Sequence, residues 1–419
     1  MTEAAILSEP VKARGGGVAI FLCLLVAMLE GFDIQAIGLV GAKLAEVAGL
    51  TKGELGFVFA MTNVGLVVGA AAGGWLADRF GRKPTLIASC LLFGAFTLAT
   101  TLAADYNTLL IVRVLTGLGL GSALPSMMAI SAEVSTPGSR ASVATMIFAG
   151  TPFGGALSAI FVANLPEHAD WRLVFVVGGA APVLIAALIL VLMRETRTMR
   201  AAAAGRDAQG GRVLHALFGE NRTAATMLIW LALFPTLMIL YILLNWLPAF
   251  SAEKGFAKPL ELALAGLQLG VNANFTFNLA SVLGALILGV VADKIGFRWP
   301  LIVAYIGLLA ALLALAGAAD LPALLAYAGV AGFFILGAQY AFYGVAASYY
   351  PEAVRGVGSG FAVAVGRVGA ILGPIAAGQL LQMKWSASQV IFAMAPMAAL
   401  AGLAVFLLSF QKRPEGEAG

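Results

Sequence analysis

The sequence predicts an all-α membrane protein with twelve transmembrane helices in two pseudo-symmetric six-helix bundles. Of its 419 residues 61% are hydrophobic and only 11% are charged, whereas soluble globular domains carry about 25% charged residues. The hydrophobic residues form continuous runs, while the strands of a membrane barrel would require alternating polarity. Similar segments return after half of the chain. These three observations indicate a duplicated helical membrane protein.

Twelve apolar runs are long enough to cross about 30 Å of hydrocarbon. They cover residues 18–41, 54–77, 84–104, 107–132, 141–164, 172–193, 223–250, 261–291, 300–318, 322–349, 356–381 and 387–410. The first run follows Lys12 and Arg14 but lacks a small-residue cleavage signature. We therefore interpret it as a retained span rather than a signal peptide.

The duplication is clearest in the connection after the second span. Its sequence Gly74-Trp-Leu-Ala-Asp78-Arg-Phe-Gly81-Arg82-Lys83 returns 215 positions later as Gly289-Val-Val-Ala-Asp293-Lys-Ile-Gly296-Phe-Arg298. The same displacement carries Arg140 onto Arg355, Gly154 onto Gly369 and Asn63 onto Asn278. Internal repeats of this kind are typical of transporters. We predict an N-terminal bundle at 1–193, a cytoplasmic linker at 194–222 and a C-terminal bundle at 223–419.

The distribution of lysine and arginine predicts the orientation. With the N-terminus inside, the inner segments hold seventeen of these residues and the outer loops hold six. The positive-inside rule then places both termini in the cytoplasm. The net charge of +4 therefore describes topology and does not indicate a nucleic-acid partner. Cys23 and Cys90 lie in apolar spans without CxxC spacing, so neither a disulfide framework nor a metal site is predicted.

The connection between spans 2 and 3 is too short for more than a tight turn. Gly81 allows the required backbone, Pro84 is suited to the first turn of the next helix, and Asp78 is close enough to approach a helix N-terminus. We interpret this segment as a clasp between helix ends. Such a clasp could hold one conformation closed on the cytoplasmic side and release it in the other.

This loop, together with the repeat, resembles the signature of the major facilitator superfamily. Arg113-Val-Leu-Thr-Gly117-Leu-Gly119-Leu-Gly121 in span 4 is similar to the superfamily's arginine-plus-glycine motif. Leu29-Glu30-Gly31-Phe32-Asp33 in span 1 and Gly366-Arg367-Val-Gly369 in span 11 resemble the aromatic acid/proton symporters, particularly hydroxyphenylpropionate-type transporters. The resemblance implies a monomeric symporter in the lipid bilayer, without a cofactor, which imports a small aromatic carboxylate together with a proton.

Five ionisable residues fall within or at the edge of the spans: Glu30, Asp33, Arg113, Glu133 and Arg367. Each costs about 2.5–3.5 kcal/mol at a helix centre, so such residues face a wet cavity or one another. Glu30 and Asp33 share one helix face at i, i+3 and would raise each other's affinity for protons. We predict that one or both carry the proton; the alternative is a permanent salt bridge to Arg113 or Arg367.

The arginines are candidates for binding a carboxylate, because guanidinium stays charged and presents a fork of donors. Gly366 and Gly369 leave room for a ligand beside Arg367. We predict substrate contacts for Arg367 and Arg113, with ion pairing to Glu30 or Asp33 as the alternative for each. Glu133 ends span 4, and the resemblance assigns it to a cytoplasmic gate. That predicted gate comprises Asp78, Gly81, Arg82, Glu133, Arg140, Asp293 and Arg355.

Polar and aromatic side chains in other spans could complete a cavity for an aromatic acid. The candidates are Asn245 in span 7, Asn274 in span 8, and Gln339 and Tyr343, which share one face of span 10. Further candidates for this role are Asn63, Trp246, Asn272, Asn278 and Tyr340. The alternative is structural, since polar residues also join helices within membranes.

None of the charges within the spans is duplicated when the displacement of 215 is applied. This displacement carries Glu30 onto Asn245, Asp33 onto Pro248, Arg113 onto Ala328 and Glu133 onto Ser348. In the other direction it carries Arg367 onto Pro152. We therefore expect the transport chemistry at these exceptions to the repeat.

Other functions remain as alternatives. A carrier of a non-aromatic acid such as muconate, or an exporter of organic acids or drugs, would use the same scaffold. The sequence contains no Walker pattern, which argues against ATP-driven transport. A membrane sensor would call for a sizeable soluble domain, and no nucleophile–histidine constellation supports an enzyme.

Overall fold

The computed structural model describes residues 16–135, 140–166, 169–193, 210–219, 222–264, 267–351 and 354–411. Its N-terminal half contains α1 (Gly16–Leu39), α2 (Gly41–Ala48), α3 (Lys52–Phe80), α4 (Arg82–Ala99), the 3₁₀ turn η2 (Thr100–Leu102), α5 (Tyr106–Val134), α6 (Arg140–Phe148), α7 (Gly150–Ala163) and α8 (Leu173–Leu192). After α9 (Gly210–Phe218), the C-terminal half contains α10 (Thr223–Glu253), β1 (Leu260–Leu264), β2 (Leu267–Val271), α11 (Ala273–Ile295), α12 (Arg298–Ala316), α13 (Leu321–Ala347), α14 (Arg355–Gln382) and α15 (Ala387–Leu408).

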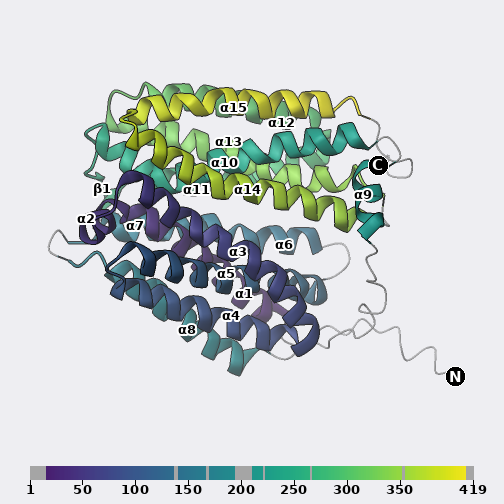
Figure 1. Cartoon of the computed structure of the whole chain (residues 1–419), viewed down its shortest axis with the longest axis horizontal. Coiled ribbons are helices and arrows are strands. Elements are labelled where there is room, and N and C mark those ends of the chain that lie inside the picture. The colour runs from purple at the N-terminus through teal and green to yellow at the C-terminus, as the bar shows by residue number, and fades with distance from the viewer. Residues whose placement is uncertain are drawn as a thin grey trace.

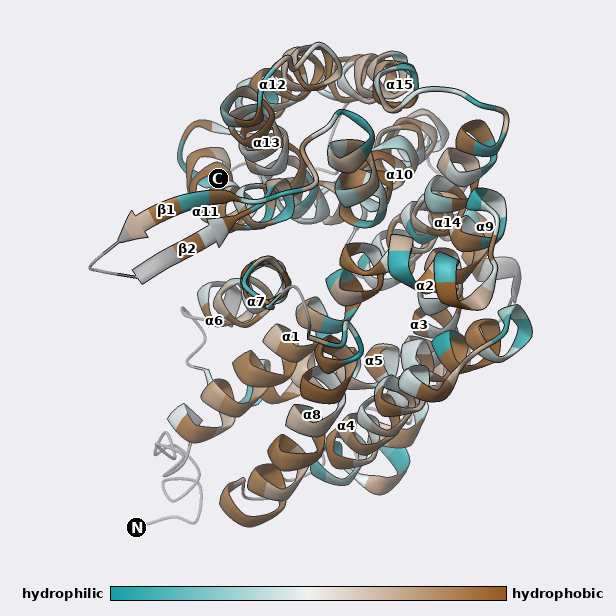
Figure 2. Cartoon of the chain, turned by 90° about the vertical axis from the view of Figure 1, so that its left-hand side faces the viewer, coloured by the Kyte–Doolittle hydropathy of each residue, from teal (hydrophilic) through white to brown (hydrophobic). Residues whose placement is uncertain are grey.

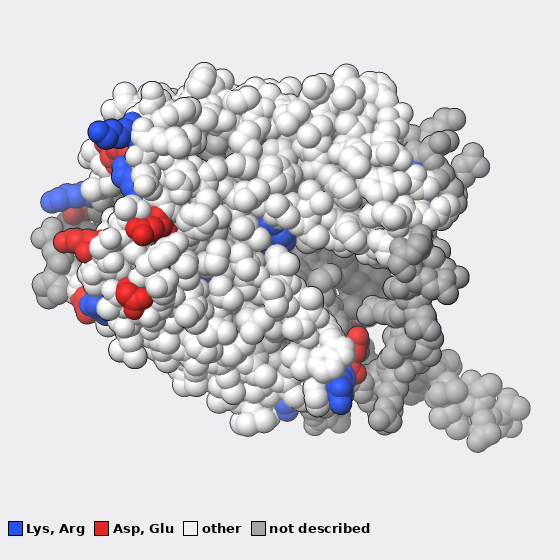
Figure 3. Space-filling model, viewed as in Figure 1, with Lys and Arg blue, Asp and Glu red and all other residues white. Residues whose placement is uncertain are grey.

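The prediction of an all-helical membrane fold is confirmed. Twelve helical segments in the described ranges are long and apolar enough to cross a bilayer. Figure 1 shows them as two stacked bundles, with α1–α8 in one and α10–α15 in the other. The end that carries α2 and the β-hairpin is called the hairpin face, and the opposite end the α9 face. Charged side chains gather toward these two ends, and the wide band between them is uncharged apart from a small basic patch near the junction of the bundles (Figure 3).

The prediction of a span over 261–291 is wrong at its start. Leu260–Leu264 and Leu267–Val271 form an antiparallel hairpin, in which Leu260 pairs with Val271, and the helix begins only at Ala273. Leucine recurs at every second position of Leu260-Glu-Leu-Ala-Leu, and this period of two is typical of a strand. Asn272 then caps α11, because its Oδ1 accepts a hydrogen bond of 2.9 Å from the amide of Phe275.

The predicted span over 141–164 is divided into α6 and α7 at Ala149. Pro152, three residues further on, has no amide hydrogen with which to bond the carbonyl of Phe148. That carbonyl instead accepts a hydrogen bond of 3.2 Å from the hydroxyl of Tyr340, which belongs to the other half. A sequence feature that weakens one helix thus creates a polar contact between the two bundles.

The repeat is visible in the local backbone of the two halves. Gly81 and Gly296, 215 positions apart, both have positive φ, of 101° and 81°, with the same ψ of 160°. Glycine is favoured there because other residues rarely adopt such angles. Asp105 and Asp320, displaced by the same amount, cap α5 and α13 by accepting backbone amide hydrogen bonds. The connection between the second and third membrane spans, and the start of the fourth span, are thus built in the same way in both bundles.

Close helix contacts repeat as well. A Cβ atom on Gly69 would lie 2.2 Å from the carbonyl oxygen of Leu118, and one on Gly284 would lie 1.9 Å from that of Phe333. Both residues of the second pair are displaced by 215 from those of the first. Small residues at such sites let two helix backbones approach closely within a membrane.

The first helix of each bundle follows a different displacement. Gly154 packs against the carbonyl of Met28, whereas its counterpart Gly369 packs against that of Phe234, which lies 206 positions after Met28. The predicted matches of Glu30 with Asn245 and of Asp33 with Pro248 are therefore wrong, because the chain between the first two helices is longer in the second half. The structural counterparts are Thr236 and Ile239. Neither is charged, so the absence of duplicated charges still holds.

Contacts between the halves concentrate toward the hairpin face. α3 packs on α14, and α7 packs on α11 and β2; Figure 2 looks onto this face and shows the hairpin beside α7. The amide of Gly53 donates a hydrogen bond of 3.0 Å to Oε1 of Gln382. Asn164 accepts from the amide of Gly270 at 2.8 Å and donates to its carbonyl at 3.1 Å. The bundles are thus joined at this end.

Candidate functional site

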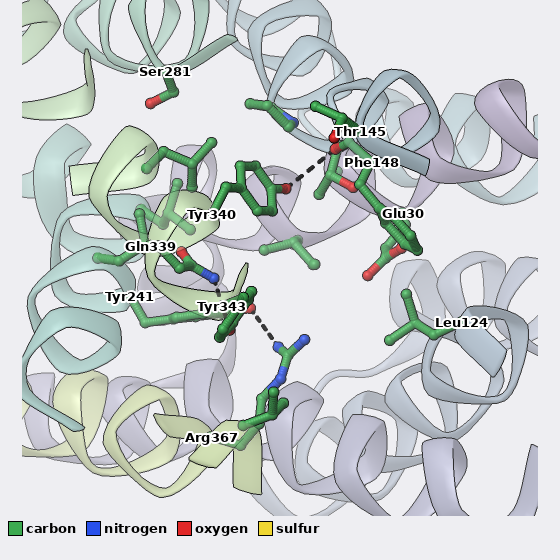
Figure 4. A pocket seen from close by; sticks show the side chains of 18 of the residues that line it. Glu30, Leu124, Thr145, Phe148, Tyr241, Ser281, Gln339, Tyr340, Tyr343 and Arg367 are labelled. Carbon is green, nitrogen blue, oxygen red and sulfur yellow. Dashed lines mark hydrogen bonds between the residues drawn. The ribbon is translucent and has the colours of Figure 1, made fainter. Parts of the chain in front are cut away.

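A cavity of about 580 Å³ lies between the two bundles and is lined by both. α1, α5, α6 and α7 contribute from the N-terminal half, and α10, α11, α13 and α14 from the C-terminal half. The lining includes Gly356 and Ser359 in the first turns of α14, so the cavity extends toward the α9 face. Its volume is in the usual range for small-molecule sites. Figure 4 shows side chains from both bundles pointing into it.

Glu30 reaches this cavity from the middle of α1. Its side chain lines the cavity although the residue is only 5% exposed, and its Oε2 has no hydrogen-bond partner among the described residues. The next residue, Gly31, brings α7 close, because a Cβ there would lie 1.7 Å from the carbonyl oxygen of Thr151. The site therefore contains a buried carboxyl group with unused hydrogen-bonding capacity.

Asp33, one helical turn further along α1, has a different environment. Its Oδ2 accepts a hydrogen bond of 2.7 Å from Nη2 of Arg113, and its Oδ1 accepts one of 2.6 Å from the hydroxyl of Thr97. Nε of Arg113 donates to Thr62 at 3.0 Å. Both charged side chains are fully buried, and neither lines the cavity. The structure thus shows the salt bridge that sequence reasoning held as the alternative for this pair.

Arg367 faces the cavity from α14 and donates a hydrogen bond of 2.9 Å from Nη1 to the hydroxyl of Tyr241. Neither Arg367 nor Glu30 forms an ion pair within 4.0 Å with any residue in the described ranges. In Figure 4 the guanidinium and the Glu30 carboxyl point into the same space from different sides. The charge of this guanidinium is therefore not neutralised by a contacting carboxylate of those residues.

Aromatic and amide side chains of α13 form the wall between these groups. Nε2 of Gln339 donates a hydrogen bond of 3.0 Å to the hydroxyl of Tyr343, while Oε1 of Gln339 has no partner among the described residues. Tyr340 lies beside them and bonds the carbonyl of Phe148. The structure thus brings together four of the predicted residues: Glu30, Arg367, Gln339 and Tyr343.

The predicted residues Asn245 and Asn274 are not in the cavity lining. Nδ2 of Asn245 donates to the carbonyl of Tyr241 at 2.8 Å, within its own helix. Nδ2 of Asn274 donates to the carbonyl of Leu244 at 3.2 Å and to Oε1 of Gln35 at 3.4 Å. Both are buried, and the amide of Asn274 joins α11 to α10 and α1.

Most of the predicted gate residues lie at helix ends on the α9 face. Arg82 forms an ion pair with Glu133 and donates from Nη1 to the carbonyl of Ala129 at 3.4 Å. Asp78 and Asp293 occupy equivalent last turns of α3 and α11. Nε of Arg355 donates to the carbonyl of Tyr350 at 3.4 Å. The side chain of Arg140 is outside the described part of the structure, as are residues 194–209 of the predicted linker.

Gln35 and Tyr241 are among the polar residues of the cavity that sequence reasoning missed. Gln35 lies five positions after Glu30, within the same polar stretch of α1, and this neighbourhood was a usable signal. Tyr241 stands in an uninterrupted apolar run of α10. Nothing in that run distinguishes it from a packing residue, and only the fold places it against Arg367.

Comparison with known proteins matches the Major Facilitator Superfamily over residues 23–276 and 261–419. The chain is 39% identical to the 3-(3-hydroxyphenyl)propionate transporter of Escherichia coli, over 93% of each chain. It is 30% identical to a 4-hydroxybenzoate transporter of Pseudomonas putida, over 93% of this chain and 91% of the relative.

A solved D-xylose–proton symporter has the same fold. It superposes with a TM-score of 0.75 at 18% identity, over 94% of this chain and 97% of the symporter. Three observations indicate the same function: the cavity between two repeated bundles, the family match along the chain, and the relatives that are named as transporters. The chain is a membrane transporter, not an enzyme, and it belongs to the major facilitator superfamily, where it groups with relatives named as aromatic acid transporters.

Proposed function

We propose that the protein imports a small aromatic carboxylate together with a proton, across the inner membrane of a bacterium. The observation that carries this proposal is the pair of unneutralised groups in one cavity, the guanidinium of Arg367 and the carboxyl of Glu30. The substrates named for the two relatives, 3-(3-hydroxyphenyl)propionate and 4-hydroxybenzoate, combine a carboxylate with an aromatic ring. They support the same class for this chain.

Arg367 is the proposed carboxylate-binding residue. Nη1 is bonded to the hydroxyl of Tyr241, which restricts the rotation of the guanidinium and leaves further donors for a ligand. The rings of Tyr340 and Tyr343 and the side chain of Phe148 line the same cavity. Flat apolar walls with a fixed cation at one side suit an aromatic acid.

Glu30 is the proposed proton carrier. An ionised carboxylate is costly to bury without a partner, and binding a proton removes that charge. Asp33 was predicted to share this role, but it is paired with Arg113 outside the cavity lining. We propose that this pair positions α1 against α5, so that Glu30 faces the cavity, and that neither Asp33 nor Arg113 contacts the substrate.

Transport would proceed by alternating access. We propose that the bundles 1–193 and 223–419 of a monomer rock as units about the linker 194–222, with both termini and α9 on the cytoplasmic side. The cavity extends toward the α9 face while contacts close the hairpin face, which corresponds to an inward-open state. The α9-face cluster of Arg82, Glu133 and Asp78, with Asp293, Arg140 and Arg355, would close the opposite state.

Purified protein in liposomes tests this proposal. With an imposed gradient, acidic outside, labelled 3-(3-hydroxyphenyl)propionate or 4-hydroxybenzoate should accumulate, and a protonophore should abolish the accumulation. One proton carried with a monoanion moves no net charge, so a membrane potential, about 2.3 kcal/mol per charge per 100 mV, should add driving force only if further protons accompany it. Absence of gradient-dependent accumulation for every aromatic acid tried would overturn the proposal.

A further inference from the structure

Two tyrosines of the cavity use their hydroxyl groups in opposite ways. The hydroxyl of Tyr340 donates its proton to the backbone carbonyl of Phe148 at 3.2 Å, because a carbonyl only accepts. The hydroxyl of Tyr241 accepts a hydrogen bond of 2.9 Å from Nη1 of Arg367, because a guanidinium only donates. The proton of Tyr340 is therefore engaged, whereas the proton of Tyr241 has no acceptor among the described residues.

This free donor is buried beside a positive charge. Tyr241 is 6% exposed, and buried polar groups in proteins are nearly always hydrogen-bonded. The guanidinium of Arg367 forms no ion pair with a residue in the described ranges, so the same place also lacks a counter-charge. A water molecule would accept the proton but would leave the charge unbalanced. An anion that accepts hydrogen bonds satisfies both requirements at once.

The distance between the two donors suits a carboxylate. Nη1 of Arg367 and the hydroxyl oxygen of Tyr241 lie 2.9 Å apart, and a carboxylate has two oxygens that each accept hydrogen bonds. One oxygen can accept from a free N–H of the guanidinium while the other accepts from the hydroxyl. The two donors are thus close enough to bind one carboxylate without movement of either helix.

Helix packing holds this pair of donors in place. A Cβ on Gly369 would lie 2.2 Å from the carbonyl oxygen of Phe234, and one on Gly366 would lie 3.1 Å from a side chain of α10. These close contacts fix α14 against α10 on both sides of Arg367 in the sequence. Both helices belong to the C-terminal bundle, so the two donors should move together when the bundles rock. Glu30 belongs to the other bundle.

We propose that the hydroxyl of Tyr241 is a direct ligand of the substrate carboxylate and forms a two-residue anion site together with Arg367. The hydroxyl donates its proton to one carboxylate oxygen while it accepts from Nη1 of Arg367. The proposal rests on the proposed function and adds a second residue that contacts the carboxylate. The C-terminal bundle then carries the anion and the N-terminal bundle, through Glu30, carries the proton. Tyr340 contributes its ring to the cavity wall but no hydrogen bond to the carboxylate.

A direct ligand can be distinguished from a residue that only holds Arg367 in place. Fluorine next to the hydroxyl withdraws electrons from the ring, which makes the hydroxyl a stronger donor and a weaker acceptor. Protein with 3-fluorotyrosine in place of Tyr241, made by stop-codon suppression, should bind the substrate more tightly if the hydroxyl donates to the carboxylate. It should bind less tightly if the hydroxyl only accepts from the guanidinium. The sign of the change therefore separates the two roles.

The test measures the dissociation constant of 3-(3-hydroxyphenyl)propionate for the full chain, by isothermal titration calorimetry in detergent. The measurement is made at pH 6, about four units below the pKa of free tyrosine. We expect Tyr241→Phe to raise the dissociation constant about tenfold, and 3-fluorotyrosine at this position to lower it about twofold.

Two controls accompany these variants. 3-Fluorophenylalanine in place of Tyr241 carries the fluorine without the hydroxyl, and it should bind as Tyr241→Phe does. Tyr340→Phe removes a cavity hydroxyl whose proton is already bonded to Phe148. It should change the dissociation constant by less than about threefold.

Calorimetry reports the dissociation constant independently of the folded fraction, which alters only the apparent stoichiometry. Weaker or unchanged binding with 3-fluorotyrosine overturns the direct contact. An effect of Tyr241→Phe no larger than that of Tyr340→Phe also overturns it, and both results leave the proposed function intact. Failure of the wild type to bind any aromatic carboxylate contradicts the proposed function itself.

Discussion

Asp33 and Arg113 form a fully buried ion pair, in which Nη2 of the arginine lies 2.7 Å from Oδ2 of the aspartate. Glu30 lies one turn away on the same helix and faces the cavity without a partner among the described residues. Two carboxyl groups of one sequence motif thus have different surroundings. The Asp33 carboxylate is held in an ion pair, whereas the Glu30 carboxyl is available to bind a proton or a ligand.

Replacement of Glu30 by glutamine should uncouple transport from the proton gradient. The amide is neutral and similar in size, so substrate binding and exchange are retained while the proton-binding group is lost. In liposomes we expect counterflow exchange of labelled aromatic acid within a few-fold of wild type, and no accumulation driven by a pH gradient. Glu46→Gln on the exposed side of α2 is the control. Full gradient-driven accumulation by Glu30→Gln would exclude Glu30 as the proton carrier.

Loss of either partner of the Asp33–Arg113 pair should destabilise the protein strongly. Removing one member of a buried pair leaves the other charge unpaired, which costs roughly 3–5 kcal/mol. We expect Asp33→Asn and Arg113→Met to lower the Tm in detergent, and the Asp33→Leu, Arg113→Met double variant to recover part of the loss. Lys43→Ala breaks an exposed pair with Glu46 and should cost about 1 kcal/mol or less. Equal, small effects at both pairs would contradict this interpretation.

Arg367→Lys should weaken substrate binding although the positive charge remains. Lysine lacks the planar fork that binds a carboxylate through two donors, and a hydrogen bond to a charged group contributes about 1.5–3 kcal/mol. We expect the dissociation constant for 3-(3-hydroxyphenyl)propionate to rise between about 10-fold and 100-fold. Tyr241→Phe removes only the hydroxyl that holds the guanidinium and should have a smaller effect. Wild-type affinity in Arg367→Lys would place the carboxylate elsewhere.

Asn164→Ala should shift the protein away from the proposed inward-open state. Asn164 makes two hydrogen bonds with the backbone of Gly270 in the β-hairpin and joins the bundles at the hairpin face. Two neutral hydrogen bonds together contribute about 1–3 kcal/mol. Their loss should favour opening at this face and closure at the α9 face.

Spin labels at Phe80→Cys and Ile295→Cys, exposed equivalent positions on the α9 face, measure this shift. The native Cys23 and Cys90 are 0% exposed and should not take the label. We expect the pulsed-dipolar distance distribution to move to shorter values in Asn164→Ala. Lys43→Ala, which lies on the hairpin face but outside the contact of Asn164 with Gly270, should leave the distribution unchanged. An unaltered distribution in both variants would mean that the hairpin contact does not control the equilibrium.

Much of the fold followed from local properties of the sequence. Long apolar runs must become helices in a bilayer, because every backbone amide and carbonyl has to be bonded within its own segment. The two glycines at 81 and 296, which adopt positive φ, were predictable from their place in the repeated motif. The hairpin at 260–271 was missed because its apolar residues were counted toward the length of a membrane span, although leucine at every second position favours a strand.

The cavity could be predicted only in part. Glu30, Arg367, Gln339 and Tyr343 were identified because polar groups within apolar spans need a partner or a wet space. The sequence could not decide which of these two environments each charge occupies, since Glu30 and Asp33 are equivalent by spacing.

The sequence by itself therefore determined the membrane fold, the duplication and the small set of charges within the spans. The tertiary structure alone decided that Asp33 meets Arg113, that Arg367 meets Tyr241, and that Gln35 and Gln339 face one cavity from opposite bundles. The residues of these three pairs lie 80, 126 and 304 positions apart in the sequence. Their placement depends on the rotation and depth of packed helices, which are set by contacts along whole helix faces and not by the local sequence.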